Sequence, residues 1–231
     1  MENEISAHAK KALHAMEKPD FNIWEKIKKI ALEVTIIVFA VMVSIWFHDQ
    51  SEHKHQQAEV KEFLEGLRED LKADVSSMKN EIVTQERAIK ASKIVTAIKT
   101  EKDLKVVKKG TEISLTSDYS FRVQNTGNYD SFESSGKLGY LENKELKKRI
   151  LGYYHQMPLL IRIENMYNKN IDQIREISPK YKGEKGLFFD PFFQQAIQLQ
   201  KVYSENLVKA YKELIEESEK TFKLIDEELK K

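Results

Sequence analysis

The stretch KKIALEVTIIVFAVMVSIWFHDQ, Lys28 to Gln50, decides how the rest of the sequence is interpreted. Residues 30–47 within it carry one charged side chain, that of Glu33. With its flanks, the stretch approaches the roughly 20 residues that a helix needs to cross a bilayer. It therefore predicts a transmembrane helix over residues 30–47, which follows a tail of residues 1–29 and precedes a domain of residues 48–231.

Aromatic and basic residues flank this stretch as they do at membrane surfaces. Trp24 and Trp46 bracket it, and a helical rise of about 1.5 Å per residue separates them by about 33 Å, close to the thickness of a hydrocarbon core. Tryptophans at that spacing are typical of the two interfaces, where Lys28 and Lys29 would also lie. A cleaved signal peptide fits less well, because WFHDQ offers no small-residue cleavage site.

Lysines are more frequent before the span than after it. The positive-inside rule then places the N-terminus in the cytoplasm and the large domain outside. We expect a bacterial inner-membrane protein with a periplasmic domain and, in residues 5–18, a short amphipathic helix on the inner leaflet. The lysines compared are Lys10, Lys11, Lys18, Lys26, Lys28 and Lys29 before the span, and Lys54 and Lys61 after it.

Glu33 is the intramembrane polar residue of this prediction. It follows Lys29 by four positions, so the two side chains share a helix face, and Glu33 near the headgroups can pair with Lys29. The alternative is a polar contact between helices of an oligomer, or part of an ion path.

A polar segment follows the span. His48, Glu52, His55 and Glu59 fall on one face of a helix, where His and Glu one turn apart can bind Zn²⁺ or titrate. A solvated helix face explains the same pattern, and no distant motif supplies further ligands. The metal site remains the weaker interpretation of the two.

The composition favours long helices. The 231 residues include only 8 glycines and 4 prolines, and charged residues make up 32% of the chain. After the span, apolar residues recur every three or four positions, which predicts one face of a helix that continues to about residue 100. These are Val60, Leu64, Leu67, Leu71, Val75, Met78, Ile82 and Ile89.

Further long helices are predicted after Asn143, a candidate N-cap, and after Asp190-Pro191, an N-cap with proline at the first helical position. Pro158 is expected to kink or split the first of these, because it cannot donate a backbone hydrogen bond. We expect an all-α fold, in which the transmembrane helix continues into an up-down helical bundle.

The connection between these helices is harder to interpret. Residues 101–128 carry the weakest pattern, and within them TEISLTSDYSFRV, residues 111–123, could form a short strand or an ordered loop. Asp130 followed by Glu133 resembles a capping box, and Gly136 is expected to end that short helix.

These last residues carry a resemblance. The run Ser134-Ser135-Gly136-Lys137-Leu138, the helix start from Asn143 to Leu146 and the pair Tyr153-Tyr154 resemble an uncharacterised family of bacterial single-pass membrane proteins of the Bacteroidetes type, classified as a domain of unknown function. Phe132 and the run from Leu67 to Leu71 fit the same pattern. The resemblance implies a topology and an architecture and implies no chemistry.

No motif for catalysis, phosphate or dinucleotide binding is present, so we predict a protein that is not an enzyme and uses no cofactor. Phe188, Phe189, Phe192 and Phe193 form an aromatic run that either plugs the bundle core or docks a partner. Four tyrosines either belong to the core or line a ligand pocket. They are Tyr153, Tyr154, Tyr167 and Tyr203.

The net charge of +1 argues against a nucleic-acid partner, and no small-molecule substrate is identified. We therefore expect an anchored bundle that contacts the lipid bilayer and either a second copy of itself or another membrane protein, as an adaptor, scaffold or accessory subunit. The alternatives are a periplasmic sensor that binds a ligand and signals through the span, and a small ion-conducting or membrane-perturbing assembly.

Overall fold

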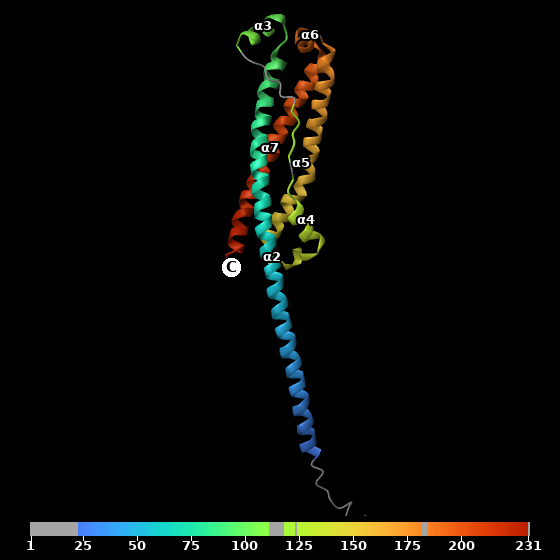
Figure 1. The fold of residues 1–231 in the computed structure, drawn as a ribbon, viewed down its shortest axis with the longest axis vertical. Helices are drawn as coiled ribbons and strands as arrows, with labels where there is room; N and C mark the ends of the chain where they lie inside the picture. The colour runs from blue at the N-terminus through green and yellow to red at the C-terminus, as the bar shows by residue number, and fades with distance from the viewer. Residues whose placement is uncertain (1–22, 111–117, 123, 182–183, 231) are drawn as a thin grey trace, which may run out of the picture. The chain divides into compact units, whose positions relative to one another are not determined.

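A computed structural model of the chain describes residues 23–110, 118–122, 124–181 and 184–230, and these form helices and no β-strand (Figure 1). The chain divides into two compact units, Met1–Gln56 and Gln57–Lys231. The all-α prediction is confirmed for the described residues. The helices are α2 (Ile23–Ala97), α3 (Glu101–Gly110), α4 (Gly127–Ser134), α5 (Lys144–Ile177), α6 (Glu184–Phe189) and α7 (Pro191–Glu228), with 3-10 turns η1 (Lys137–Tyr140) and η2 (Ser178–Lys180).

The first unit holds the N-terminal part of α2. Side chains over residues 27–42 and 44–50 are exposed, although residues 30–47 are almost all apolar. This part of α2 is long and apolar enough to cross a membrane. The predicted amphipathic helix of residues 5–18 lies outside the described residues.

In the second unit, α7 runs antiparallel to α2. Near the C-terminal end of α7, Arg68 Nε donates a hydrogen bond to Asp226 at 2.8 Å. Nearer the start of α7, the Ser204 hydroxyl donates to Gln85 at 2.8 Å. Along α2 the contacts go from Arg68 to Gln85, while their partners on α7 go back from Asp226 to Ser204. The two helices therefore run in opposite directions.

Helix α5 also runs antiparallel to α7. Arg149 donates to Glu217 at 3.2 Å, and further along α5 the hydroxyl of Tyr211 donates to Glu164 at 2.9 Å. Since both α2 and α5 oppose α7, they are parallel to each other. The up-down order expected for successive long helices is therefore not confirmed.

An extended segment explains this arrangement. We call residues 118–122 and 124–126 the strap. The hydroxyl of Ser120 donates to Glu81 of α2 and its backbone N–H donates to Asn168 of α5, whereas Asn125 contacts Asp74 of α2. The strap thus descends alongside α2 and α5 and returns the chain to the end where α4 lies, so that α5 starts beside α2 and runs the same way (Figure 1).

The apolar face predicted for α2 forms one wall of the core. Val60, Leu64, Leu67, Leu71, Val75 and Met78 are buried. Burial of one such side chain stabilises the fold by roughly 1.5–3 kcal/mol. Three fully buried tyrosines are the largest side chains of the core, and they come from α5 and α7: Tyr153, Tyr167 and Tyr211.

Several helix ends follow the sequence prediction. The Asn143 side chain accepts a hydrogen bond from the N–H of Leu146 at 3.1 Å, and Asp190 accepts one from Phe193 at 2.7 Å, so both N-caps are confirmed. Gly136 has a φ of +74°, a left-handed conformation that other residues adopt at a cost, and it ends the α4 region as predicted.

One local prediction is wrong, and one of the two alternatives for Pro158 is excluded. The N-cap of α4 is Thr126, so Asp130 lies inside the helix and forms no capping box, while Glu133 accepts from the hydroxyl of Tyr129. Pro158 does not split α5, which runs as one helix from Lys144 to Ile177. Pro158 itself is exposed, and it leaves the carbonyl four positions earlier without its usual helical partner.

Gly66 allows α4 to approach α2 closely. A Cβ atom at this position would lie 2.8–2.9 Å from the side chain of Asn128, which donates to Asp70 at 2.8 Å. The glycine therefore has a packing role, beyond its cost to the helix. Gly152 in α5 offers a matched comparison, because nothing lies within 4 Å of its Cβ position.

Gly152→Ala should raise the free energy of unfolding by about 1 kcal/mol, the gain in helix propensity of alanine over glycine. Gly66→Ala should gain less or lose stability, because the methyl group displaces Asn128 from Asp70. In an Asn128→Ala background, Gly66→Ala should regain the full benefit. Urea unfolding of the four variants measures this coupling, and equal gains at both glycines would contradict the packing role.

Candidate functional site

The residues predicted for the membrane interface lie in the first unit. Trp24, Trp46, Lys28 and Lys29 are exposed on α2, as is Glu33. Exposure of aromatic and aliphatic groups over this length has a large free-energy cost in water, and the cost is removed when lipid surrounds them. The unit itself therefore provides a surface suited to a bilayer.

The predicted His/Glu face is not assembled as a metal site. Glu52 accepts a hydrogen bond from Gln56 at 3.1 Å, and Glu59 forms an ion pair with Lys137 at 2.8 Å. His48 and His55 are exposed. Among the described residues, no group of three or more His, Cys, Asp or Glu side chains is placed to hold a metal ion.

The aromatic run divides into buried and exposed members. Phe188 and Phe193 are buried, with ring centroids 6.1 Å apart in an edge-to-face arrangement. Phe192 is 72% exposed and Phe189 is 36% exposed. Phe188 and Phe193 therefore belong to the core, whereas Phe189 and Phe192 remain candidates for docking a partner.

The tyrosines point into the core and toward the strap. Tyr153 donates its hydroxyl to Asp74 at 2.9 Å, Tyr154 donates to the carbonyl of Asn125 at 3.3 Å, and Tyr167 donates to the carbonyl of Asp118 at 3.3 Å. Tyr203 is partly buried against the same core. The hydroxyls of Tyr154 and Tyr167 thus hold the strap in place.

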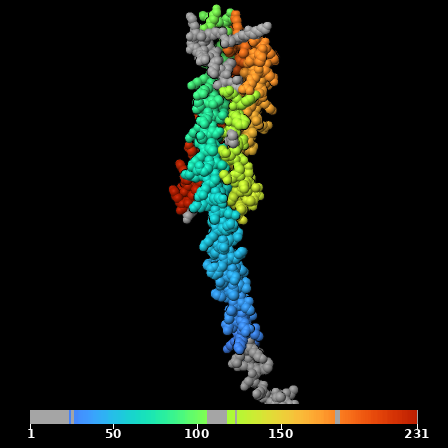
Figure 2. Space-filling view, viewed as in Figure 1, coloured from blue at the N-terminus to red at the C-terminus, as the bar shows by residue number. Residues whose placement is uncertain are grey.

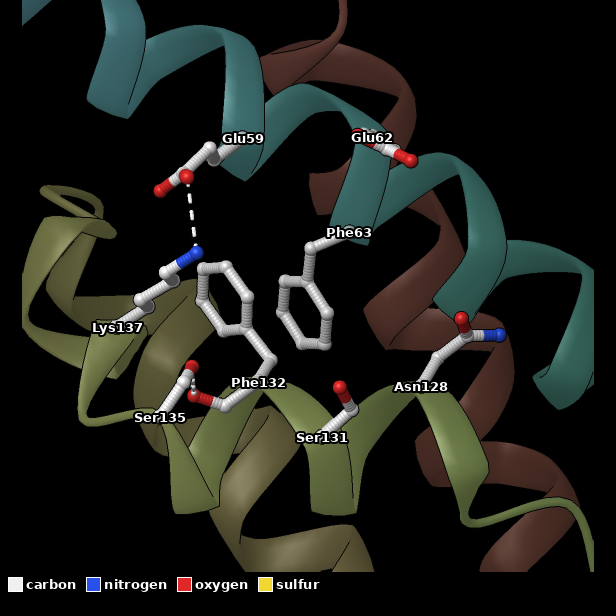
Figure 3. A pocket seen from close by; sticks show the side chains of 8 residues that line it. All are labelled: Glu59, Glu62, Phe63, Asn128, Ser131, Phe132, Ser135 and Lys137. Carbon is white, nitrogen blue, oxygen red and sulfur yellow. Dashed lines mark hydrogen bonds and ion pairs between the residues drawn. The ribbon is translucent and has the colours of Figure 1, made fainter.

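A hollow of about 240 Å³ opens between α2, α4 and η1 (Figure 3). Phe63 and Phe132 stack in it with ring centroids 3.9 Å apart. The amine of Lys137 reaches Glu59 at one side, and this hydrogen bond raises the pKa of Lys137. The lining residues are Glu59, Glu62, Phe63, Asn128, Ser131, Phe132, Ser135 and Lys137.

A second cluster lies under the strap and was not predicted. Its centre is Arg122, whose side chain is fully buried. Its Nε donates to Glu164 Oε1 at 3.2 Å, and its Nη1 lies 3.7 Å from Asp74 Oδ1. Asp74 and Glu164 are also buried. No sequence motif marks this triad, because its members come from α2, the strap and α5.

Tyrosines and a serine complete the cluster. Tyr153 donates to Asp74, while Tyr211 donates to Glu164 and lies 3.1 Å from the hydroxyl of Ser120. Burial, followed by the neighbouring carboxylates, raises the pKa of both phenols well above its usual range. The phenols therefore stay protonated at neutral pH and act as donors to the carboxylates.

Glu81 adds a third carboxyl group at the edge of the cluster. It accepts a hydrogen bond from the Ser120 hydroxyl at 3.0 Å. Burial is the main cause that raises the pKa of Glu81, because desolvation penalises the charged form. One guanidinium thus faces three carboxyl groups, and the cluster has an excess of negative charge when all three are ionised.

Glu81→Gln should raise the melting temperature at pH 7, because glutamine keeps an oxygen for Ser120 and removes a partly desolvated charge. The pKa of Glu81 is higher in the folded state than in the unfolded state, so the wild-type protein loses folding stability as pH rises above 4.5. The advantage of the variant should therefore shrink as pH falls toward the ordinary value of 4.5.

Calorimetry from pH 4 to pH 8 measures this difference. Glu176→Gln, at an exposed carboxyl group of α5, is the matched control and should change the melting temperature little at any pH. An advantage of Glu81→Gln that is independent of pH would contradict the assignment.

Comparison with known proteins places the chain in a family. No curated protein and no solved structure shows a significant match to it. A family model, described as a family of unknown function (DUF6090), matches residues 33–191. This range includes most of the candidate membrane span, the strap, the Gly136 motif and α5. The match covers more than half of the sequence, so the chain belongs to this family of unknown function, DUF6090.

Proposed function

We propose that this chain is a non-enzymatic, single-pass bacterial inner-membrane protein that works by protein–protein contact, as an adaptor, scaffold or accessory subunit. One observation carries the proposal: residues 30–47 expose apolar side chains along a helix, while the second unit has a closed core of its own. The first unit is suited to anchorage and the second to presentation of a folded surface.

The lysine distribution supports an orientation. Six lysines precede the span and two follow within a similar distance, which favours a cytoplasmic N-terminus and a periplasmic position for residues 48–231. Residues 30–47 would then act as an uncleaved signal-anchor.

The polar groups of the second unit support contact over catalysis. Asp74 and Glu164, the buried carboxylates, accept hydrogen bonds from Tyr153 and Tyr211, and they face the strap. Exposed Lys and Glu side chains along α7 pair with each other, as Lys220 does with Glu216 and Glu217. Such a charged helical exterior is suited to association with a complementary protein surface.

The hollow at Phe63 and Phe132 favours a second candidate, a sensor that binds a small ligand and signals through the span. Its volume of about 240 Å³ lies below the several hundred Å³ of most ligand pockets. A Ser131→Trp variant would fill the hollow. Loss of signalling in this variant, while its contacts with protein partners stay normal, would favour the sensor.

Cysteine labelling tests the orientation, because the chain has no cysteine of its own. In spheroplasts, a membrane-impermeant maleimide should label a Ser51→Cys variant, and should label a Ser6→Cys variant only after lysis. The reverse pattern would overturn the orientation, and extraction of the protein by carbonate would overturn the membrane anchor.

Cross-linking in native membranes tests the contact function. A photoreactive maleimide on Ser76→Cys, at an exposed site of α2, should yield cross-links to a partner or to a second copy, which mass spectrometry identifies. Ser204→Cys is the matched control, because Ser204 is fully buried and should give only background. No cross-link above that background, at Ser76 and at exposed sites on α5 and α7, would overturn the contact function.

A further inference from the structure

The strap is held to the second unit by polar groups. Its side chains alternate: Ser120 and Arg122 are buried, whereas Phe121 between them is 79% exposed and Tyr119 is 42% exposed. No described residue of the strap buries an apolar side chain. In Figure 2 the yellow-green atoms of this region lie at the surface between α2 and α5. The strap therefore fills a groove from outside and is not part of the hydrophobic core.

The groove contacts the backbone of the strap as a neighbouring β-strand would. The side-chain amide of Asn168 accepts from the N–H of Ser120 at 2.9 Å and donates to the carbonyl of the same residue at 3.0 Å. Asp74 accepts from the N–H and the side-chain amide of Asn125, at 3.4 Å and 3.0 Å. Contacts to the main chain select an extended segment and depend little on its sequence.

One side-chain position is selective. The groove places Asp74 and Glu164 around the guanidinium of Arg122, and Met157 Sδ lies 3.6 Å from Nη2. A guanidinium donates in several fixed directions, so two carboxylates from different helices suit it better than they suit an ammonium. Arg122 Nη1 is buried without a hydrogen bond and lies 3.7 Å from Asp74 Oδ1, so its contact with Asp74 is an ion pair without a hydrogen bond.

We propose that this groove is a docking site for an extended segment of a protein partner that carries an arginine two positions after a small polar residue, and that the strap is its resident occupant. The excess of carboxylate over guanidinium in the groove provides the charge complementarity for such a partner. This inference rests on the proposed contact function and names the chemistry of the contact. A partner segment binds by replacing the strap: its arginine takes over the buried contacts that Arg122 makes with Asp74 and Glu164, and Phe121, already exposed, loses no core contact.

Peptide binding to the full-length chain in detergent tests the proposal. The probe is a fluorescent peptide with the sequence of residues 118–128, DYSFRVQNTGN. The Arg122→Ala chain should bind it saturably and at least tenfold more tightly than the wild-type chain, whose own strap competes. A probe with lysine in place of its arginine should bind at least tenfold more weakly, because the guanidinium geometry is lost.

Two further variants locate the binding. Asp74→Asn in the Arg122→Ala background should weaken binding at least tenfold, whereas Glu176→Gln in that background should leave binding unchanged. Equal binding of the arginine and lysine probes, or no saturable binding to a helical Arg122→Ala chain, would overturn the proposal.

If the Arg122→Ala chain loses its helicity, amide hydrogen exchange on the wild-type chain tests the proposal instead. Excess unlabelled probe should speed amide hydrogen exchange within the chain's own strap severalfold and leave exchange in α5 and α7 unchanged. No acceleration would overturn the proposal. These experiments use purified chain and a synthetic peptide, so they are independent of the cross-linking in membranes. Cross-links to a partner without peptide binding would overturn the docking site alone. Peptide binding without cross-links would overturn the contact function alone.

Discussion

The second unit depends on one buried contact, the guanidinium of Arg122 between Asp74 and Glu164. Charges taken out of water have a large desolvation cost, which only close pairing and further hydrogen bonds offset. Removal of one partner from a buried pair costs roughly 3–5 kcal/mol, because the remaining charge stays buried. Tyr153 and Tyr211 supply the further donors, so α2, α5, α7 and the strap all meet at this point. Their relative positions are consequently tied to the geometry of a few polar atoms.

Apolar packing surrounds this contact, and a second polar layer lies beyond it. Ser204 donates to Gln85 at 2.8 Å, and Ser92 and Gln200 lie 3.4 Å apart, all of them buried between α2 and α7. A shift of α7 by one turn would separate these pairs and leave buried groups unsatisfied, which is costly. Polar pairs of this kind add little to stability and favour one alignment of two otherwise similar helices.

The sequence predicts the long helices and most of their ends, because these depend on local rules. Apolar residues at helical spacing place Leu64 and Leu71 in the core, and Asn143 and Asp190 cap their own helices. Asp130 shows the limit of such rules, since Thr126 starts the helix one turn earlier.

The candidate site was not predicted, because its parts come together only in the folded chain. Arg122 is separated from Asp74 by 48 positions and from Glu164 by 42, and no spacing rule connects them. Ser120 and Arg122 point inward at strand spacing, but two residues are too few for a periodic signal. Gly66 had a visible cost to its helix, and its benefit depends on Asn128, which lies on another element.

The direction of the strap has a consequence for synthesis of the chain on the ribosome. Ser120 and Arg122 emerge when α2 is already available, but Glu164 follows Arg122 by 42 positions and Tyr211 follows Ser120 by 91. Until α5 and α7 emerge, the nascent strap has only one wall of its groove, and Arg122 remains hydrated beside Asp74. The strap is therefore synthesised early but reaches its final position late. Until then, an unfinished chain exposes both Arg122 and the carboxylate of Asp74 to solvent.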